Sequence, residues 1–226
     1  MKIRWLGWVS LTTLVLTTLW LILMIADLAM AGPLETFEQV LAHVSRQGWI
    51  FTLTYLNAGL LTIAATILMT GLYVYTQPAA PALSRIGLVF VPVYATLNLV
   101  AYFSQITLIP ALLEASSNPE SAASAYMLLQ LSIQLWPDSV IAFFNGLAYA
   151  ILGVPSIIFG WAMFKRVHRL RLPGWLLTIS GSASLLGALG TMIGSALVSK
   201  GTLIGGLVFW LALFPLTIDF LRGVDE

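Results

Sequence analysis

Seven polar side chains stand inside long apolar segments of the chain, where amide and phenol groups are costly. They are Tyr55, Asn57, Asn98, Tyr102, Gln105, Asn145 and Tyr149. These groups donate and accept hydrogen bonds and carry no charge at neutral pH. An unpaired amide in hydrocarbon is unfavourable, so we expect these groups to face one another or a wet cavity. The chemistry they indicate is hydrogen bonding to a small neutral or amphiphilic molecule.

The spacing of these residues places them on common helix faces. Tyr94, Asn98, Tyr102 and Gln105 follow an i, i+4, i+8, i+11 pattern, and Asn145 and Tyr149 an i, i+4 pattern. The simpler interpretation is hydrogen bonding between helices, worth about 0.6 kcal/mol per bond on average. The functional alternative is an outward-facing pocket between the second, third and fourth spans. The sequence leaves both open.

The composition decides which elements must position these groups. Of the 226 residues, 59% are hydrophobic and only 8% are charged, and the mean hydropathy is +0.96. A soluble surface needs far more charge, about 25% in an ordinary domain. The sequence therefore predicts an integral membrane protein and excludes a soluble enzyme or a nucleic-acid partner. The absence of cysteine excludes disulfides and thiolate metal sites.

Six apolar runs are long enough to cross a bilayer, which takes about 20 helical residues. They cover residues 5–30, 49–76, 86–113, 139–164, 174–198 and 202–221. Backbone groups in lipid must pair within their own segment, so these runs must be helices. We expect an all-α bundle in a single transmembrane domain, residues 1–226. Residues 199–201 are predicted to form a tight turn between the last two spans.

Basic residues predict the orientation of the bundle. With the N-terminus inside, the inner side holds Lys2, Arg4, Arg85, Lys165, Arg166, Arg169, Arg171 and Arg222, and the outer side only Arg46 and Lys200. This excess predicts cytoplasmic termini. The N-terminus imitates a signal peptide, but its uncharged run from Trp5 to Ala26 is too long for one, so we expect a retained first helix.

Two predicted outer loops contain short helices. Leu34, Phe37, Val40, Leu41 and Val44 recur at helical spacing and predict an amphipathic helix at the outer interface. The stretch from Tyr126 to Trp136 predicts a second surface helix, which Pro137 and Asp138 end. Ordinary packing at the interface is the simpler function of these two helices, and a lid over the outer face is the alternative.

The placement of ionisable residues argues against several chemistries. No lysine or carboxylate stands in the middle of a span, and His43 and His168 fall on opposite sides of the membrane, so neither a metal nor a cofactor is expected.

On the outer side, His43 accompanies Asp27, Glu35, Glu38, Glu114 and Asp138. A solvated acidic surface is the expectation there, and acid–base catalysis on a lipid-like substrate is the alternative. Asp219 is expected to pair with Arg222 on the inner side.

Small residues mark the fifth span. Ser180, Ser184, Gly187, Thr191 and Gly194 are predicted to form one face, with Gly190 and Gly194 as a GxxxG pair. Such faces let helix backbones approach closely. Packing within the last hairpin or against the first span is expected, and a homodimer interface is the alternative.

One stretch of the sequence resembles a known family. It runs from Asn145 through Phe164, continues in the basic turn from Lys165 to Trp175 with its Leu-Pro-Gly close, and ends in the small-residue fifth span. The turn at residues 75–78 is also similar, although the family often has a basic residue where Gln77 stands. The resemblance is to a bacterial family of six-helix membrane proteins known only as a domain of unknown function. It implies a protein of the plasma (inner) membrane and supplies no catalytic residues.

Three functions stay open at this point. The first is non-catalytic binding or sensing of a small amphiphile or lipid by the seven polar residues. The second is an accessory or scaffolding subunit that packs against a protein partner in a larger complex. The third, a transporter or an intramembrane enzyme, is disfavoured because no charge stands deep in a span.

Overall fold

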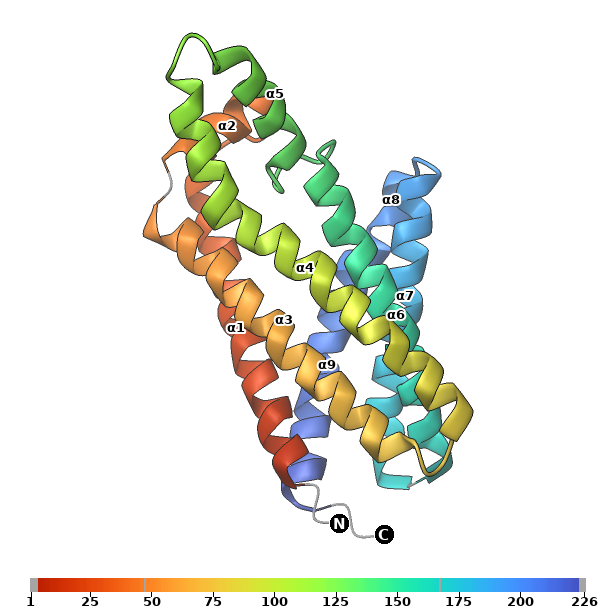
Figure 1. Ribbon diagram of the computed structural model, residues 1–226. Coiled ribbons are helices and arrows are strands. Elements are labelled where there is room, and N and C mark those ends of the chain that lie inside the picture. Colours follow the sequence, from red (N-terminus) through yellow and green to blue (C-terminus); the bar gives the residue numbers. More distant parts are fainter. Residues whose placement is uncertain (1–3, 47, 167, 224–226) are drawn as a thin grey trace. The chain divides into compact units, whose positions relative to one another are not determined.

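A computed structural model describes residues 4–46, 48–166 and 168–223 of the chain. Lys2 and Val167 lie outside these ranges, as do the side chains of residues 165–168 in the basic turn. The regular elements of the described residues are helices (Figure 1). This confirms the predicted all-α fold.

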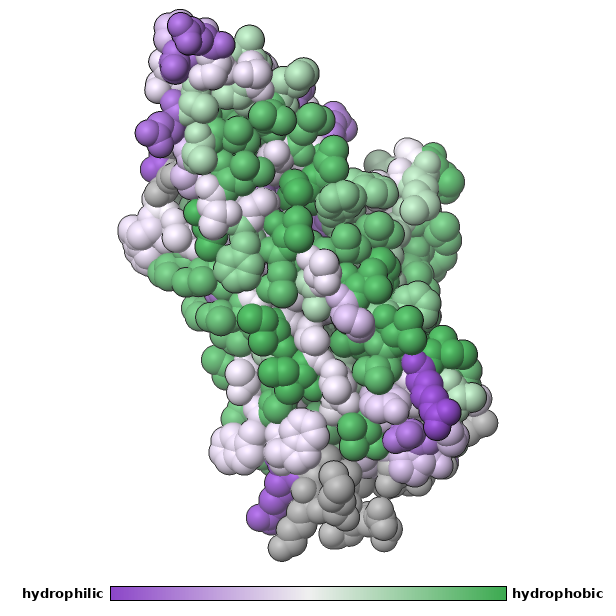
Figure 2. Space-filling model, in the orientation of Figure 1, coloured by the Kyte–Doolittle hydropathy of each residue, from purple (hydrophilic) through white to green (hydrophobic). Residues whose placement is uncertain are grey.

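Six helices are long and apolar enough to cross a membrane, as predicted. Five of them are α1 (Arg4–Ala31), α3 (Trp49–Thr76), α4 (Pro81–Ser116), α6 (Val140–Arg166) and α7 (Arg171–Met192). The sixth combines α8 (Ala196–Ser199) and α9 (Gly201–Leu221). Three short elements connect the spans: α2 (Phe37–Ser45), α5 (Ala122–Ser132) and the 3-10 helix η1 (His168–Leu170). Apolar side chains cover most of the face shown in Figure 2, as expected for surfaces that contact lipid.

The third span is longer than predicted. It begins at Pro81 instead of residue 86 and ends at Ser116 instead of residue 113. Proline fits the first turn of a helix, where its missing N–H has no partner to lose. The 36 residues of α4 extend over about 54 Å, against a hydrocarbon thickness of about 30 Å. The helix is therefore long enough to continue beyond the bilayer or to cross it with a large tilt.

The turn of the last hairpin lies elsewhere than predicted. Helix α7 ends at Met192, and the chain reverses at Gly194, whose φ is +69°. The Ser195 N–H donates to the Gly190 carbonyl at 2.8 Å and the Gly194 N–H to the Thr191 carbonyl at 3.2 Å. These two bonds form a Schellman motif, in which glycine takes the left-handed position. Gly194 therefore ends the helix, and residues 199–201 continue the next one.

The chain divides into two compact units. Unit 1 contains Met1–Val15, Leu61–Thr96 and Gly146–Glu226, and unit 2 contains Leu16–Leu60 and Leu97–Asn145. Helices α1, α3, α4 and α6 each have residues in both units.

Close approaches of glycine to backbone hold the helices of unit 1. A Cβ added to Gly187 would collide with Thr202 of α9, and one added to Gly181 would collide with the Gly153 carbonyl of α6. The Ser180 hydroxyl donates to the Gly205 carbonyl of α9 at 2.8 Å. The predicted packing within the hairpin is thus confirmed.

Two details of that predicted small-residue face are wrong. Thr191 is exposed and Gly194 belongs to the turn, so the packed face continues through Gly190. Gly181 of α7 makes a separate close contact with Gly153 of α6. The spacing of small residues in α7 alone does not reveal this contact.

Polar contacts complete unit 1. The Thr217 hydroxyl lies 3.0 Å from the Ser10 hydroxyl, which donates to the Leu213 carbonyl at 3.4 Å, so α1 is bonded to α9. The Asp219 carboxylate accepts a bond from Arg169 Nε at 2.8 Å. Arg169, in η1, is thus the partner of Asp219, where the sequence suggested Arg222 in the next turn.

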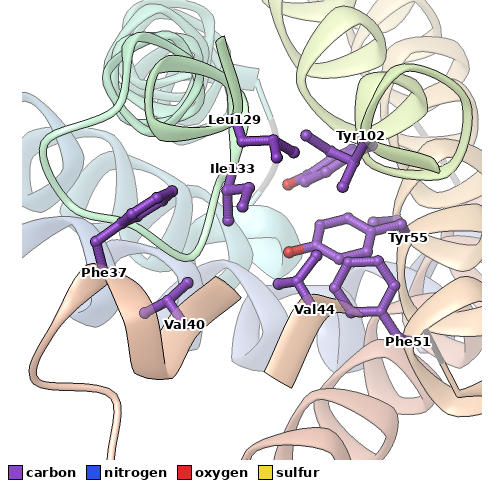
Figure 3. Close-up of a cluster of buried hydrophobic side chains, with 10 residues drawn as sticks. Phe37, Val40, Val44, Phe51, Tyr55, Tyr102, Leu129 and Ile133 are labelled. Carbon is purple, nitrogen blue, oxygen red and sulfur yellow. The ribbon is translucent and has the colours of Figure 1, made fainter. Parts of the chain in front are cut away.

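Unit 2 has its own apolar core, shown in Figure 3. Its members come from α2, α3, α4, α5 and the residue after α5: Phe37, Val40, Val44, Phe51, Tyr55, Ala58, Tyr102, Ile109, Leu129 and Ile133. Helix α2 starts with a capping box, in which Thr36 accepts from the Gln39 N–H and Gln39 accepts from the Thr36 N–H. Its buried residues Phe37, Val40 and Val44 confirm the predicted amphipathic helix, although Leu34 lies before its first residue. Its position at the outer interface stays a prediction.

Helix α5 is shifted from its predicted place. It begins at Ala122 and ends at Ser132, whereas the pattern suggested residues 126–136. The backbone becomes extended at Ile133, and the Gln134 N–H donates to the side chain of Gln105 at 3.0 Å. That bond replaces the next helical bond, and Pro137 could not have continued the helix.

Candidate polar site and a buried aspartate–histidine pair

Gln105 uses its amide to tie α4 to the end of α5. Its Nε2 donates to the Ser132 carbonyl and to the Ser104 hydroxyl, both at 2.9 Å, and its Oε1 accepts from the Gln134 N–H. The side chain is 0% exposed. Gln105 therefore has a structural role in unit 2, whatever else it contacts.

Asn57 has a comparable structural bond. It is 5% exposed, and its Nδ2 donates to the Leu16 carbonyl of α1 at 2.9 Å. Hydrogen bonds from asparagine and other polar side chains are among the contacts that join neighbouring membrane helices. The interpretation as a bond between helices thus holds for this residue.

Tyr55 and Tyr102 belong to the apolar core of unit 2. The ring of Tyr55 packs against Phe51, with centroids 4.7 Å apart, and lies 6.4 Å from the ring of Tyr102. In Figure 3 both phenol oxygens point toward the interior of the cluster. Their rings therefore stabilise the core, and their hydroxyls are polar groups within it.

Asn98 differs from the other predicted residues. It is 0% exposed, and neither its Oδ1 nor its Nδ2 has a hydrogen-bond partner within the described residues. Leaving a buried amide atom unpaired costs about 1–3 kcal/mol. Most buried polar groups in proteins are paired, so each exception calls for an explanation. Two more buried atoms of unit 2 have no hydrogen-bond partner within the described residues, namely Gln134 Oε1 and Asn145 Oδ1.

The seven predicted residues are divided between the units. Tyr149 belongs to unit 1, and the other six belong to unit 2. Tyr149 and Tyr102 both have polar or ring contacts. The role of the seven residues in binding a common ligand stays a prediction.

Asp27 and His43 form a buried pair that sequence reasoning missed. His43 Nε2 lies 3.2 Å from Asp27 Oδ2, and the two residues are 8% and 5% exposed. The expectation of a solvated surface is wrong for these two, although Glu35, Glu38, Glu114 and Asp138 are exposed. The missed signal is spacing, because His43 follows Val40 by three positions and shares the buried face of α2.

The pair is an acid–base unit with a defined geometry. A carboxylate beside one ring nitrogen fixes the orientation and the tautomer of an imidazole. The ring of Phe51 packs edge-on against His43, with centroids 6.4 Å apart, and covers it on the side of α3. No group of three or more histidine or acidic residues that could hold a metal occurs in the described part of the chain.

A second polar contact joins the two short helices of unit 2. The Tyr126 hydroxyl donates to Glu38 Oε1 at 3.0 Å. The backbone N–H of Glu38 itself, and then the Tyr126 hydroxyl, lower the pKa of the Glu38 carboxyl. The same bond raises the pKa of the Tyr126 phenol. The aromatic ring of Phe37 packs against both Tyr126 and Trp136, so polar and aromatic contacts hold α2 and α5 together.

Comparison with known proteins places the chain in a family. Residues 11–219 match the family described as domain of unknown function DUF4386. The chain belongs to this family. The match confirms the resemblance seen in the sequence. Comparisons of the DUF4386 chain with curated proteins and with solved structures gave no match. The chain is thus a multi-pass membrane protein of the DUF4386 family, and any function must be argued from its residues.

Proposed function

We propose that this DUF4386 protein binds a small amphiphile or lipid without catalysing a reaction. The site would combine polar groups of α3, α4 and α6 with the neighbouring apolar surface. In the predicted orientation, with cytoplasmic termini in a plasma membrane, α2 and α5 face outward and the site opens to that side. The observation that carries the proposal is the amide of Asn98, buried with both of its polar atoms unpaired.

The free-energy cost of burying the Asn98 amide unpaired supports a ligand contact rather than a purely structural role. An asparagine that serves structure, such as Asn57, has a bond to a neighbouring span. Asn98 has no bond of that kind in the described residues, so its burial costs free energy. A ligand that supplies both a donor and an acceptor would recover this cost, and the recovered free energy would contribute to affinity.

The predicted residues of unit 2 then divide into two roles. Asn57 and Gln105 fix the spans through their own bonds and position the site. Asn98 and Asn145, which have unpaired atoms, are the proposed ligand contacts. Tyr55 and Tyr102 would complete the proposed site.

Native mass spectrometry of the full chain, extracted gently from its own membrane, tests the proposal. A reproducible small adduct on the wild type, lost in Asn98→Leu, is expected. Thr107→Val is the matched control on α4, because the Thr107 hydroxyl is exposed and donates to the Phe103 carbonyl of its own helix. A bare chain would contradict the proposal. A co-purifying protein with no small adduct would favour the accessory-subunit function instead.

A further inference from the structure

Helix α5 exposes large apolar side chains on the side away from the core of unit 2. Met127, Leu128 and Leu131 are 60%, 46% and 43% exposed, whereas Ala125 and Leu129 on the opposite side of the helix are buried. The sequence from 121 to 137, which contains this helix, has no charged residue. The three exposed side chains, called the α5 apolar face below, therefore fit an apolar partner better than water.

We propose that the α5 apolar face inserts among the acyl chains of membrane lipids. In the predicted orientation of the chain, these lipids belong to the outer leaflet. Helix α5 would thus lie in the membrane interface without crossing the bilayer. The proposal concerns an exposed surface and none of the buried polar groups, so it does not depend on the proposed function.

Two hydrogen bonds fix the position of α5 along α4. At the start of α5, the Ser121 hydroxyl donates to the Ala115 carbonyl at 2.7 Å. At its end, the Gln105 side chain donates to the Ser132 carbonyl at 2.9 Å, and this is the inner of the two bonds. Helix α5 therefore runs back along the end of α4, from the level of Ala115 to that of Gln105.

This position brings the α5 apolar face to the depth of exposed residues on two spans. Leu128 precedes the inner bond by four residues along α5, and Leu108 follows it by three along α4, so the two lie at nearly the same level. Tyr55 and Tyr102, whose rings lie 6.4 Å apart, align α3 with α4. Trp49 and Leu108 both lie six residues from this contact, about 9 Å toward α2 and α5.

The exposed residues at this level are of the kinds that contact lipid. Trp49 is 70% exposed and Leu108 is 43% exposed. Tryptophan is enriched where the hydrocarbon of a bilayer meets its headgroups, and leucine on a span faces the acyl chains. The α5 apolar face therefore continues the lipid-facing surface of α3 and α4 at the same depth.

Helix α2, which packs against α5 (Figure 1), exposes a polar face instead. Its exposed residues include Glu38 and Gln39, and Arg46 follows its end. Between the two helices, the ring of Tyr126 packs on Phe37 with centroids 5.2 Å apart, and its hydroxyl donates to Glu38. A tyrosine with an apolar ring and a polar tip suits the boundary between lipid and water. The two helices thus present one face for water and one for lipid.

Spin labels on single cysteines test the proposal, because the chain has no cysteine of its own. Met127→Cys and Leu131→Cys carry the label on the α5 apolar face. Ala42→Cys is the matched control on the exposed face of α2, and Leu108→Cys is the control on a span. The full-length variants, in phosphatidylcholine vesicles, would be exposed to oxygen, which concentrates in hydrocarbon, and to a water-soluble nickel chelate. Power saturation of the EPR signal measures the collisions of each label with each reagent.

The ratio of oxygen collisions to nickel collisions decides the outcome. For the two α5 labels this ratio should equal that of the α4 label and exceed that of the α2 label several-fold. A ratio equal to that of the α2 label would overturn the proposal, because the face would then lie in water.

Low collision rates with both reagents would also overturn the proposal, since protein would then cover the α5 apolar face. Dipolar broadening of the spectra would identify that protein as a second copy of the chain. Leu128→Cys replaces either α5 variant if one does not fold, because its side chain belongs to the same exposed face.

Discussion

Substitution of two buried asparagines by leucine should change stability in opposite directions. Asn57 and Asn98 are 5% and 0% exposed, and leucine has the same number of side-chain heavy atoms. The amide of Asn57 donates to the Leu16 carbonyl, whereas both polar atoms of Asn98 are unpaired in the described structure. In the ligand-depleted protein, Asn57→Leu should therefore destabilise and Asn98→Leu should stabilise.

The structure gives the size of each effect. Asn57→Leu removes one bond between helices, worth about 0.6 kcal/mol on average and at most about 1.7 kcal/mol. Asn98→Leu removes two unpaired buried atoms, each of which costs about 1–3 kcal/mol. Leucine will not fit the space of the asparagine perfectly, and this imperfect packing offsets part of the gain. We therefore expect the free energy of unfolding of Asn98→Leu to rise by about 1–3 kcal/mol.

Equilibrium unfolding in mixed micelles, followed by tryptophan fluorescence, measures both variants. The eight tryptophans of the chain provide the signal. With the endogenous ligand retained, Asn98→Leu should lose its advantage, because the wild type then gains the free energy of binding. Destabilisation by Asn98→Leu equal to or larger than that by Asn57→Leu, in lipid-depleted protein, would refute the reasoning.

Three further predictions concern other contacts. His43→Leu should destabilise by about 3–5 kcal/mol, measured by the same unfolding, because it leaves the Asp27 carboxylate buried without its partner. Gly181→Ala should lower the melting temperature, because its Cβ would collide with backbone of α6. Tyr126→Phe should raise the pKa of Glu38 toward its ordinary value, measured by NMR titration. Because that pKa is lowered in the folded protein, the stability contributed by Glu38 is present above its ordinary pKa and is lost as the pH falls through the lowered one.

Each of these predictions has a control. Asp27→Asn in the His43→Leu background should recover part of the lost stability, since no buried charge then remains. Gly206→Ala, where an added Cβ meets open space, should be neutral or slightly stabilising. A Glu38 pKa that does not change in Tyr126→Phe would mean that its backbone N–H and the side chain of Thr36 hold it down without Tyr126. Equal melting of the two alanine variants would contradict the close packing of α7.

Much of the fold could be predicted because the membrane restricts the alternatives. A long apolar run must be a helix in lipid, so all six spans were found from length and composition. The apolar face of α2 was also evident from spacing. The hairpin turn was misplaced because Gly194 fits either a packed helix face or a left-handed cap. Only the positions of its neighbours distinguish these two uses of glycine.

The sequence by itself determined the class of protein, the spans and the polar residues to consider. Hydropathy and helical period depend on residues that are close in the chain, and one sequence contains that information. The tertiary structure decided the partner of each polar group. Asn57 and Asn98 are the same residue type in similar apolar surroundings, yet one is bonded across 41 residues and the other is unpaired in the described structure. The pairing of Asp27 with His43 likewise requires the chain to fold back over 16 residues. A hydrogen bond depends on distances of a few tenths of an ångström between such separated segments, and no local pattern in the sequence sets those distances.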